Sequence, residues 1–239
     1  MKLGIIGYGK MGRIIDKIAT DRGHEVTLKV SKNNAKQFLD NDIENVDVAI
    51  EFTQPIAAFD NILHCIKNQI PVVSGTTGWL DQMETIVEKN RIYNGAFLYA
   101  SNFSLGMNIF FKLNSYLAKL MNTQVDYSIS MEEIHHTEKK DEPSGTAITL
   151  ANQIIQNNNR LKDWSLGNSG EELIPIDSIR SGKVPGTHKI KYDSVFDEIE
   201  ISHAAKNRNG FAFGAVYAAE WIKGKTGNFT MDDVLNLDF

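Results

Sequence analysis

Short apolar runs alternate with amphipathic stretches over the first part of the chain. Apolar runs of a few residues that end at a glycine or a polar residue are typical of buried parallel strands. Apolar side chains that recur every three or four positions are typical of helices. The pattern predicts strands at residues 3–6, 25–30, 46–52, 71–74 and 96–100, and helices at 11–21, 56–68 and 80–90. This alternation predicts right-handed crossovers and a Rossmann-like parallel sheet.

The pattern changes near residue 104. It predicts a long apolar helix at Leu105–Met121, a strand at 127–134, a helix at 146–156, strands at 189–193 and 198–202, and a helix at 211–223. Consecutive strands without crossover helices indicate an α+β domain with a mixed or antiparallel sheet. The polar, asparagine-rich stretch 156–170 predicts a surface loop. We therefore expect an α/β fold with two domains, one formed by residues 1–104 and 208–239 and the other by residues 105–207.

A glycine-rich turn follows the first predicted strand and opens the first predicted helix. It reads Gly7-Tyr8-Gly9-Lys10-Met11-Gly12, the G-x-G-x-x-G pattern of dinucleotide-binding folds. The first glycine permits a tight turn, the second lets a pyrophosphate approach the backbone, and the third allows close packing of helix on strand. The N-terminus of the helix attracts the anion. This context favours a dinucleotide site made by all six residues; the alternative is an ordinary tight turn.

The end of the second predicted strand bears on the choice of cofactor. An acidic residue there would bind the ribose 2′-hydroxyl of NAD, but the sequence reads Val30-Ser31-Lys32-Asn33. Ser31 can donate a hydrogen bond, and Lys32 can neutralise a 2′-phosphate. We expect NADPH to be preferred over NADH, with both accepted. The alternative is that Lys32 is an ordinary solvated lysine.

Three more segments lie at the carboxyl ends of predicted strands, where open α/β sheets bind ligands. They contribute Phe52 and Thr53, then Gly75, Thr76 and Thr77, and finally Ala100, Ser101, Asn102 and Phe103. Gly75 lets the backbone approach a flat ring. Asn102 can either bond a nicotinamide or shape the hinge. Thr76, Thr77 and Ser101 are equally suited to be helix N-caps. The shared placement of these segments favours cofactor contacts.

The densest group of reactive side chains lies at the end of the strand predicted at 127–134 and in the loop after it. Its members are His135, His136, Lys139, Ser144, Gly145 and Thr146. An imidazole titrates near neutral pH and can act as an acid or a base, and a lysine can donate a proton or hold a carboxylate. Free N–H groups and hydroxyls at the start of the following helix form an anion site.

Two other interpretations of this group stay open. A charged surface loop followed by a capped helix has the same composition. Adjacent histidines near acidic residues can also bind zinc, but the sequence has no second His or Cys pair at the usual spacing. We therefore expect no bound metal.

The amino-acid composition bears on which partners and which cellular compartment are expected. The 25 basic and 30 acidic residues give a net charge of −5, which argues against a nucleic-acid partner. The single cysteine, Cys65, cannot form a disulfide framework within one chain, as is usual in a reducing compartment. The apolar start of the chain is too short for a signal peptide, and no apolar run is long enough to span a membrane. We expect a cytoplasmic protein with no membrane partner.

The order of three motifs resembles the 4-hydroxy-tetrahydrodipicolinate (dihydrodipicolinate) reductase family. The motifs are the glycine turn, the Ser-Gly-Thr-Thr-Gly segment at 74–78, and His-His-x-x-Lys followed by Asp-x-Pro-Ser-Gly-Thr at 135–146. The resemblance covers essentially the whole chain. It implies an oxidoreductase of diaminopimelate and lysine biosynthesis that transfers a hydride from NAD(P)H to ring C4 of a cyclic dicarboxylate. It also implies a homotetramer.

The resemblance further implies a role for each domain and site residue. Residues 1–104 and 208–239 would bind the dinucleotide, and 105–207 would bind the substrate and carry the oligomer contacts. His135 would be the acid or base and Lys139 the proton donor. His136, Ser144, Gly145 and Thr146 would bind the substrate. Arg208 would join the glycine turn and the segments after the strands as a cofactor contact.

The chain departs from the family pattern at several positions. Ser31 stands in place of an acidic residue, Glu142 in place of a small one, residues 184–188 in place of a Gly-Glu-His turn, and Phe213 in place of asparagine. Two rival functions also stay open. A semialdehyde dehydrogenase needs a nucleophilic cysteine, and Cys65 lies among apolar residues in a predicted helix. A regulator that binds NAD(P) without turnover would need the glycine turn but not the His135–Thr146 group.

Overall fold

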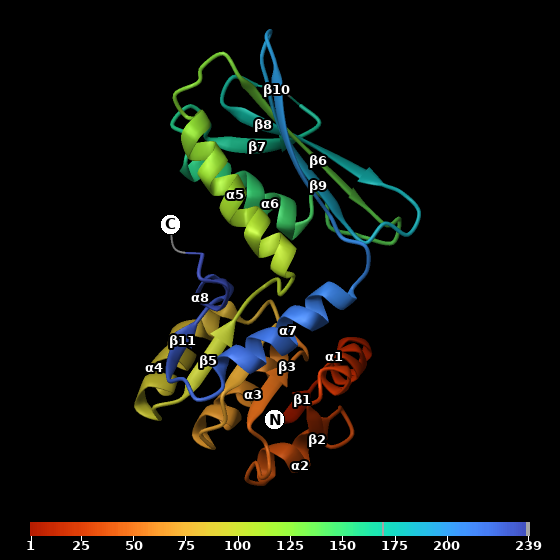
Figure 1. The fold of residues 1–239 in the computed structure, drawn as a ribbon, viewed down its shortest axis with the longest axis vertical. Helices are drawn as coiled ribbons and strands as arrows, with labels where there is room; N and C mark the ends of the chain where they lie inside the picture. Colours follow the sequence, from red (N-terminus) through yellow and green to blue (C-terminus); the bar gives the residue numbers. More distant parts are fainter. Residues whose placement is uncertain (169, 238–239) are drawn as a thin grey trace. The chain divides into compact units, whose positions relative to one another are not determined.

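A computed structural model describes residues 1–168 and 170–237, which fall into two compact units (Figure 1). Unit 1 comprises Met1–Leu105 and Asn209–Phe239, and unit 2 comprises Gly106–Arg208. Each boundary lies one residue later than the one expected from the sequence. The last two residues of the expected 208–239 segment lie outside the described residues.

Unit 1 is built on a six-stranded sheet in which every pair of neighbouring strands is parallel. The strands are β1 (Lys2–Ile6), β2 (Glu25–Val30), β3 (Val48–Glu51), β4 (Val72–Ser74), β5 (Ala96–Tyr99) and β11 (Gly227–Phe229). Their order across the sheet is β11-β5-β4-β3-β1-β2. The chain leaves β1 toward β2 on one side and returns to β3 on the other, so the strand order reverses beside β1. The predicted Rossmann-like parallel sheet is confirmed.

Helices cover both faces of this sheet (Figure 1). They are α1 (Lys10–Asp21), α2 (Ala35–Asp40), α3 (Pro55–Lys67), a 3-10 turn η1 (Leu80–Gln82), α4 (Met83–Ile92), α7 (Asn209–Ile222) and α8 (Met231–Leu235). Because strand side chains alternate between faces, Val48 and Ile50 of β3 pack with α1 and α7. Ala49 between them packs on the other face with Ile62 and Cys65 of α3. Both faces of the sheet are therefore buried, as a parallel sheet requires.

Unit 2 has a five-stranded mixed sheet in the order β10-β9-β6-β8-β7. The strands are β6 (Ser128–His135), β7 (Asp163–Leu166), β8 (Leu173–Arg180), β9 (Thr187–Asp193) and β10 (Glu198–Ala204). Strand β6 runs antiparallel to β9 and parallel to β8, which confirms the predicted mixed sheet. Helices α5 (Leu105–Met121) and α6 (Gly145–Gln156) pack on the face that carries Met131, Ile176 and Ile190.

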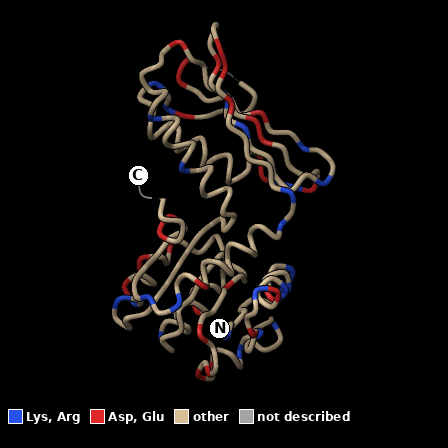
Figure 2. The backbone as a smooth tube through the Cα atoms, in the orientation of Figure 1, with Lys and Arg blue, Asp and Glu red and all other residues tan. Residues whose placement is uncertain are grey.

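The other face of this sheet is charged. Lys189 lies 2.9 Å from Glu132 on the neighbouring strand, and Lys191 pairs with Glu198. Figure 2 shows acidic and basic positions interspersed along these strands. Alternation of apolar and charged side chains along β6 and β9 thus separates a core face from a polar face.

One sequence prediction was wrong. The stretch 156–170, expected to be a surface loop, contains the strand β7. Trp164 packs against the core of unit 2, and the strand pairs in parallel with β8. Pairing and burial of one large side chain outweigh the polar composition of this segment. Helices α2 and α8 and strands β8 and β11 were also not predicted from the sequence.

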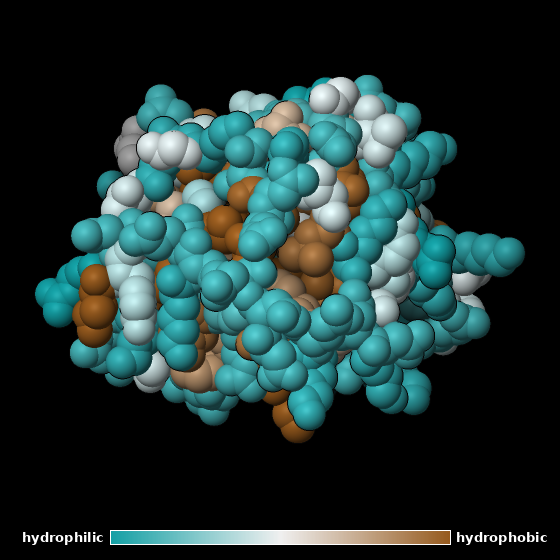
Figure 3. All heavy atoms as spheres, turned by 90° about the horizontal axis from the view of Figure 1, so that it is seen from below, coloured by the Kyte–Doolittle hydropathy of each residue, from teal (hydrophilic) through white to brown (hydrophobic). Residues whose placement is uncertain are grey.

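Among the described residues, no helix combines the length and apolarity needed to cross a membrane. The face drawn in Figure 3 carries mostly hydrophilic residues, with hydrophobic residues in small areas among them.

Candidate active site

The glycine turn has three glycines with three different surroundings. Gly7 has a φ of +100°, and a Cβ there would lie 1.9 Å from the carbonyl oxygen of Phe52. A Cβ at Gly12 would lie 2.4 Å from the carbonyl oxygen of Gly7. A Cβ at Gly9 would meet nothing within 4 Å. A side chain at residue 7 or 12 would therefore collide with the backbone of the turn. At residue 9 there is free space beside the backbone.

The N-terminus of α1 is available to an anion. Gly9 is the N-cap residue and provides no side-chain cap, so the N–H groups of the first turn have no side-chain acceptor there. Lys10 is exposed and Met11 is half-buried. Tyr8 donates a hydrogen bond to Asp16, and the guanidinium of Arg13 lies 5.2 Å from the centre of its ring. The turn thus combines open backbone donors with basic side chains, as a phosphate group requires.

A pocket of about 240 Å³ lies at the carboxyl ends of β3 and β4, beside the turn. It is lined by Met11, Phe52, Thr53, Pro55, Gly75, Thr76 and Thr77. All of these except Pro55 were predicted cofactor contacts. A Cβ at Gly75 would lie 2.3 Å from the ring of Phe52, so residue 75 must be small for the ring to lie there. The pocket sits where the strand order reverses, which is where open α/β sheets bind ligands.

A larger pocket of unit 1, about 550 Å³, is lined by residues of α4 together with Gly95 and Gly227. These glycines lie at the amino ends of β5 and β11. It is therefore at the opposite edge of the sheet from the glycine turn, and we do not associate it with the cofactor.

Glu51 organises the segments around the smaller pocket. It is fully buried at the end of β3, and its carboxylate accepts hydrogen bonds from Ser74 Oγ at 2.6 Å and Thr76 Oγ1 at 2.8 Å. It also accepts from the backbone N–H of Thr53 at 3.0 Å. Thr76 is thus held by Glu51 rather than serving as a helix cap. Glu51 was not predicted as a site residue, although a carboxylate at the end of an apolar strand is a visible signal.

The remaining predicted contacts of unit 1 lie in different surroundings. Ser101 is exposed, Ala100 is buried, and Phe103 is buried with its ring 5.7 Å from that of Phe52. Asn102 accepts a hydrogen bond from the backbone N–H of Ser104 at 2.9 Å, just before α5 begins. Thr77 is exposed beside the pocket.

The segment after β2 carries no carboxylate. The backbone N–H of Ser31 donates to Asn34 Oδ1 at 2.7 Å, and its hydroxyl lies 3.2 Å from the same atom. Lys32 is exposed. The turn therefore presents a lysine and a hydroxyl where NAD-selective folds present an acidic side chain. Uncapped N–H groups at the start of α1, free space beside Gly9, a pocket at the strand ends and basic neighbours together fit a dinucleotide.

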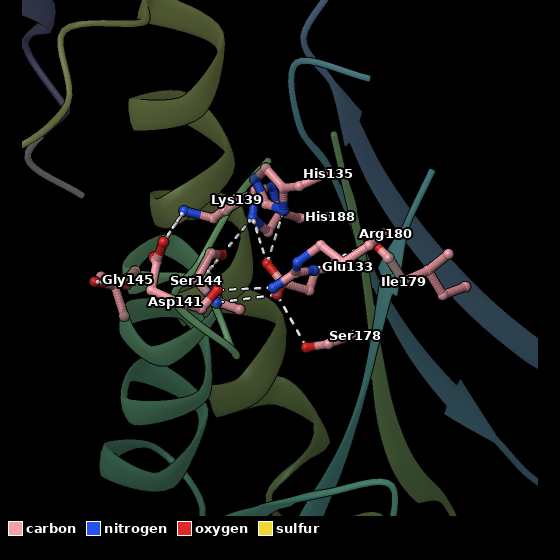
Figure 4. A network of polar contacts seen from close by, with 12 residues as sticks. Glu133, His135, Lys139, Asp141, Ser144, Gly145, Ser178, Ile179, Arg180 and His188 are labelled. Atoms are coloured by element: carbon pink, nitrogen blue, oxygen red, sulfur yellow. Dashed lines mark hydrogen bonds and ion pairs between the residues drawn. The ribbon is translucent and has the colours of Figure 1, made fainter. Parts of the chain in front are cut away.

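The polar cluster of unit 2 is centred on Glu133, which is fully buried in β6 (Figure 4). One carboxylate oxygen, Oε1, accepts hydrogen bonds from the backbone N–H of Ser144 at 3.0 Å, Ser178 Oγ at 2.9 Å and Arg180 at 3.1 Å. The other oxygen, Oε2, lies 3.0 Å from Nδ1 of His135. This last pair is an ion-pair contact whose alignment falls short of a standard hydrogen bond. Glu133 therefore connects β6, β8 and the start of α6.

Two effects on the pKa of Glu133 oppose each other. Burial raises it, but contacts from His135, Ser144 and Ser178 outweigh burial and hold the pKa well below its usual range. The carboxylate is therefore ionised at neutral pH.

His188 of β9 completes the cluster. Its Nε2 lies 3.2 Å from Ser144 Oγ and 3.8 Å from Glu133 Oε2. The rings of His135 and His188 meet edge to face with centroids 5.2 Å apart. Burial, together with the nearby charge of His135, lowers the pKa of His188 to about 4. His188 is therefore neutral at physiological pH.

The loop after β6 places the other predicted residues around this cluster. Lys139 Nζ lies 2.7 Å from the carboxylate of Asp141. Ser144 is the N-cap of α6, and its hydroxyl accepts from the backbone N–H of Ala147 at 3.1 Å. Gly145 is exposed and Thr146 half-buried in the first turn of α6. His136 is half-buried directly after the strand. Unit 2 thus joins an imidazole, a lysine and a helix N-terminus.

Glu133, His135 and His188 each offer a ligand atom, and these atoms lie within 4.8 Å of one another. Two imidazoles and a carboxylate can bind zinc or iron. However, Arg180 already bonds the same carboxylate, and its positive charge opposes a cation at this position. The contacts favour a hydrogen-bonded acid–base cluster over a metal centre.

Sequence reasoning missed Glu133, Ser178, Arg180 and His188 as site residues. The alternation along β6 puts Glu133 on the same face as His135, which is a signal available from the sequence. In the parallel register Ser178 lies beside Glu133 and Arg180 beside His135, and His188 lies beside Glu133 on the other side. These contacts depend on strand pairing that the sequence did not predict. Arg208, a predicted cofactor contact, is exposed at the end of unit 2.

A parallel sheet with a glycine turn at its reversal point, together with an imidazole–lysine cluster on a separate unit, is the arrangement expected of a nicotinamide-nucleotide-dependent reductase. Residues 1–103 match the family described as dihydrodipicolinate reductase, N-terminus, and residues 106–235 match dihydrodipicolinate reductase, C-terminus. The chain belongs to the dihydrodipicolinate reductase family, whose members are oxidoreductases.

Individual relatives agree with this assignment. The chain is 52% identical over 243 aligned positions to a 4-hydroxy-tetrahydrodipicolinate reductase of Christiangramia forsetii, covering 99% of this chain and 98% of that protein. Its fold is similar to a dipicolinate-bound dihydrodipicolinate reductase from Paenisporosarcina sp. TG-14, with a TM-score of 0.75, 20% identity, and 96% and 97% of the two chains covered. A probable dehydrogenase from Thermotoga maritima has the same general fold at a TM-score of 0.58 and 11% identity, with 99% and 93% covered.

Proposed function

We propose that this chain reduces 4-hydroxy-tetrahydrodipicolinate to tetrahydrodipicolinate with NAD(P)H, a step of diaminopimelate and lysine biosynthesis. The observation that carries the proposal is the 52% identity, over 99% of the chain, to a reductase of that name. The reaction balances as substrate, NAD(P)H and one proton giving product, NAD(P)⁺ and water. When bound, the nicotinamide supplies the hydride, which goes to ring C4 of the dehydrated, conjugated imine.

The residues of the glycine turn would hold the dinucleotide. Open backbone at Gly9 and the uncapped start of α1 support binding of the pyrophosphate. Lys32 and Ser31 would face the adenosine ribose, and the missing carboxylate supports a preference for NADPH over NADH. The pocket at Phe52, Gly75 and Thr76 would take part of the same cofactor.

The substrate carries two carboxylates, and unit 2 offers groups that bind them. Gly145 and Thr146 contribute N–H groups at the start of α6, where the helix dipole favours an anion. Lys139 and His136 add positive charge or hydrogen-bond donors beside this helix start. Ser144 would support this site indirectly, because its hydroxyl caps the N-terminus of α6. These groups hold and orient the dianion, and orientation lowers the barrier to reaction.

A proton must reach the ring after the hydride arrives. His188 is neutral at physiological pH, which leaves His135 as the imidazole and Lys139 as the ammonium group that are chemically able to supply it. His135 has the buried carboxylate of Glu133 at Nδ1. We assign His135 as the acid or base, with Lys139 as a proton donor and a contact for a substrate carboxylate.

A semialdehyde dehydrogenase is less well supported. Its nucleophile would have to be Cys65, which is fully buried in α3. Burial, followed by the nearby charge of Glu51, raises the pKa of this thiol far above its usual range, so the thiolate nucleophile is not formed. A regulator that only binds NAD(P) would not need the Glu133–His135–Lys139 group.

Assembly and location follow the family resemblance. We propose a homotetramer assembled through the sheet of unit 2, acting in the cytoplasm on a small molecule, with no nucleic-acid or membrane partner. Size-exclusion chromatography with light scattering measures the mass of the assembly directly.

A coupled enzyme assay tests the proposed reaction. Pyruvate and aspartate semialdehyde are converted to the substrate in situ by the preceding enzyme of the pathway, and consumption of NADPH and NADH is followed after this chain is added. We expect oxidation that requires both the coupling enzyme and this chain, with tetrahydrodipicolinate as the product. Oxidation without formation of that product would point to another reductase activity.

A further inference from the structure

We propose that Glu133 is the positioning residue of the proton-transfer step: it holds the Nδ1 side of His135, so that Nε2 exchanges the proton with the substrate. This inference rests on the proposed function and deepens it by naming the reacting nitrogen and the residue that selects it.

The first support is the placement of the two side chains. They are two residues apart on β6 and therefore on the same face of the strand. Glu133 is fully buried and the His135 side chain is 9% exposed. Glu133 Oε2 lies 3.0 Å from His135 Nδ1. A buried imidazole with an ionised carboxylate at one nitrogen keeps its hydrogen there and presents the other nitrogen for chemistry.

The second support is that the carboxylate itself is fixed. Its Oε1 receives three donors from two other elements: the N–H of Ser144 at the start of α6, and Ser178 and Arg180 of β8. Three donors on one oxygen prevent the carboxylate from turning, so Oε2 remains directed at His135. Arg180 is fixed in turn, because it also donates to the carbonyl oxygen of Asp141 at 2.8 Å.

The third support lies on the Nε2 side of His135. A Cβ at residue 186 would lie 3.0 Å from Nε2 and 3.3 Å from the neighbouring ring carbon Cδ2. Because residue 186 is glycine, it places no side chain against this nitrogen. A larger residue at this position would crowd Nε2, whereas Glu133 occupies Nδ1.

The charged groups around His135 agree with this division of roles. Glu133 shares its strand, Arg180 lies beside it on β8, and Lys139 with Asp141 occupies the loop after β6. His188 faces it from β9, with His203 next to His188 on β10. Burial lowers the pKa of both His188 and His203, so neither adds a positive charge at neutral pH. Glu133 is the buried anion in contact with His135.

The proposed proton transfer accounts for every bond and electron pair. The N–H bond at Nε2 of protonated His135 breaks, and its proton bonds to the ring made electron-rich by the arriving hydride. The electron pair of that bond stays on Nε2, which leaves a neutral imidazole with its hydrogen on Nδ1 facing Glu133. Solvent returns the proton in the next cycle.

Glu133→Gln tests the inference sharply. The three donors on Oε1 require the amide oxygen at that position, so the amide nitrogen takes the place of Oε2. Nδ1 of His135 then meets a donor and must accept, which moves the hydrogen to Nε2. We expect kcat to fall by about 100-fold or more, with the substrate KM within about threefold and NADPH affinity unchanged. Imidazole nitrogen NMR of selectively labelled protein, recorded at a pH at which His135 is neutral, is expected to show His135 switching from the Nδ1–H to the Nε2–H tautomer.

Glu132→Gln is the matched control. This carboxylate is adjacent in sequence but belongs to the opposite face of β6, where it pairs with Lys189 at 2.9 Å. We expect its kcat to stay within about twofold of wild type and its His135 tautomer to be unchanged, because this side chain pairs with Lys189 and does not reach the cluster around Glu133.

The outcomes separate the inference from the function on which it rests. A folded Glu133→Gln variant that turns over at the wild-type rate would overturn the inference, as would an Nε2–H tautomer of His135 in the wild-type protein. The wild-type spectrum needs no variant to fold. If the wild-type protein shows no reductase activity, the proposed function fails, while the tautomer spectra still decide whether Glu133 controls His135.

Discussion

Glu133 Oε2 lies 3.0 Å from His135 Nδ1, and both side chains are buried at the end of one strand. An imidazole that must gain and lose a proton in a buried place needs a counter-ion, because an unpaired buried charge costs several kcal/mol. In the proposed mechanism the paired carboxylate meets that need and leaves the second ring nitrogen for the substrate. The proposed acid–base group and its counter-ion would then both belong to β6.

Replacing His135 by Gln is expected to remove proton transfer while leaving the dinucleotide unit intact. General acid–base catalysis contributes about 10²- to 10⁴-fold, so kcat should fall within that range. The dissociation constant of NADPH, measured by nicotinamide fluorescence, should stay within about twofold, since unit 1 supplies every predicted cofactor contact except Arg208. Unchanged turnover in the variant would refute the role of His135.

The glycine turn supports a prediction that separates folding from binding. Gly9→Ala places a methyl group in open space, so the free energy of unfolding should change by no more than about 0.5 kcal/mol. Dinucleotide affinity should nevertheless fall at least about tenfold, because the methyl blocks the approach of a pyrophosphate. Gly12→Ala places the same group 2.4 Å from the carbonyl oxygen of Gly7 and should destabilise the protein by about 2 kcal/mol or more. Urea unfolding and NADPH titration of both variants measure the two effects, and equal losses of stability would contradict this account.

Lys32→Ala addresses cofactor choice. If Lys32 faces the 2′-phosphate, NADPH affinity should fall about three- to tenfold, and NADH affinity should not change. Lys36→Ala, another exposed lysine a few residues further on, serves as the control and should alter neither. The difference between the cofactors should shrink as salt increases, because the contact is exposed. Equal affinities for NADPH and NADH in the wild-type protein at low salt would disprove the preference.

The depressed pKa of His188 predicts how stability responds to acid. The unfolded imidazole titrates near 6.5 and the folded one at about 4, so between these values the unfolded state binds more protons. The contribution of neutral His188 to the free energy of unfolding is fully present above pH 6.5. This contribution, on the order of 3 kcal/mol, is lost as pH falls toward 4. His188→Gln should remove this part of the pH dependence. Urea unfolding at both pH values compares the two proteins; parallel losses of stability would show that His188 does not titrate in this way.

The parallel sheet of unit 1 could be predicted because its strands are short apolar runs closed by glycine or polar residues. The glycine turn and the segments at Phe52, Gly75 and Thr76 could be placed by the same reasoning, since carboxyl ends of parallel strands share one edge. Strands β7 and β11 could not be predicted. Asp163–Leu166 lies in an asparagine-rich stretch, and Gly227–Phe229 has only three residues, too few to show a period.

The polar cluster of unit 2 could be predicted only in part, for a different reason. His135, Lys139 and Ser144 lie within one stretch of sequence and could be recognised together. Ser178 and Arg180 reach Glu133 only because β8 pairs in parallel with β6, and β8 was not predicted. Contacts that depend on strand register between distant segments are not encoded in any local pattern.

We expect reduction of 4-hydroxy-tetrahydrodipicolinate by this chain to depend on the cluster of unit 2. NADPH absorbance in the coupled reaction tests this, with wild-type protein and Lys139→Ala compared at equal NADPH occupancy. We expect rapid oxidation by the wild type and a loss of about 100-fold or more in the variant. Tight NADPH binding by the wild type without any turnover, or turnover by the variant at the wild-type rate, would contradict this expectation.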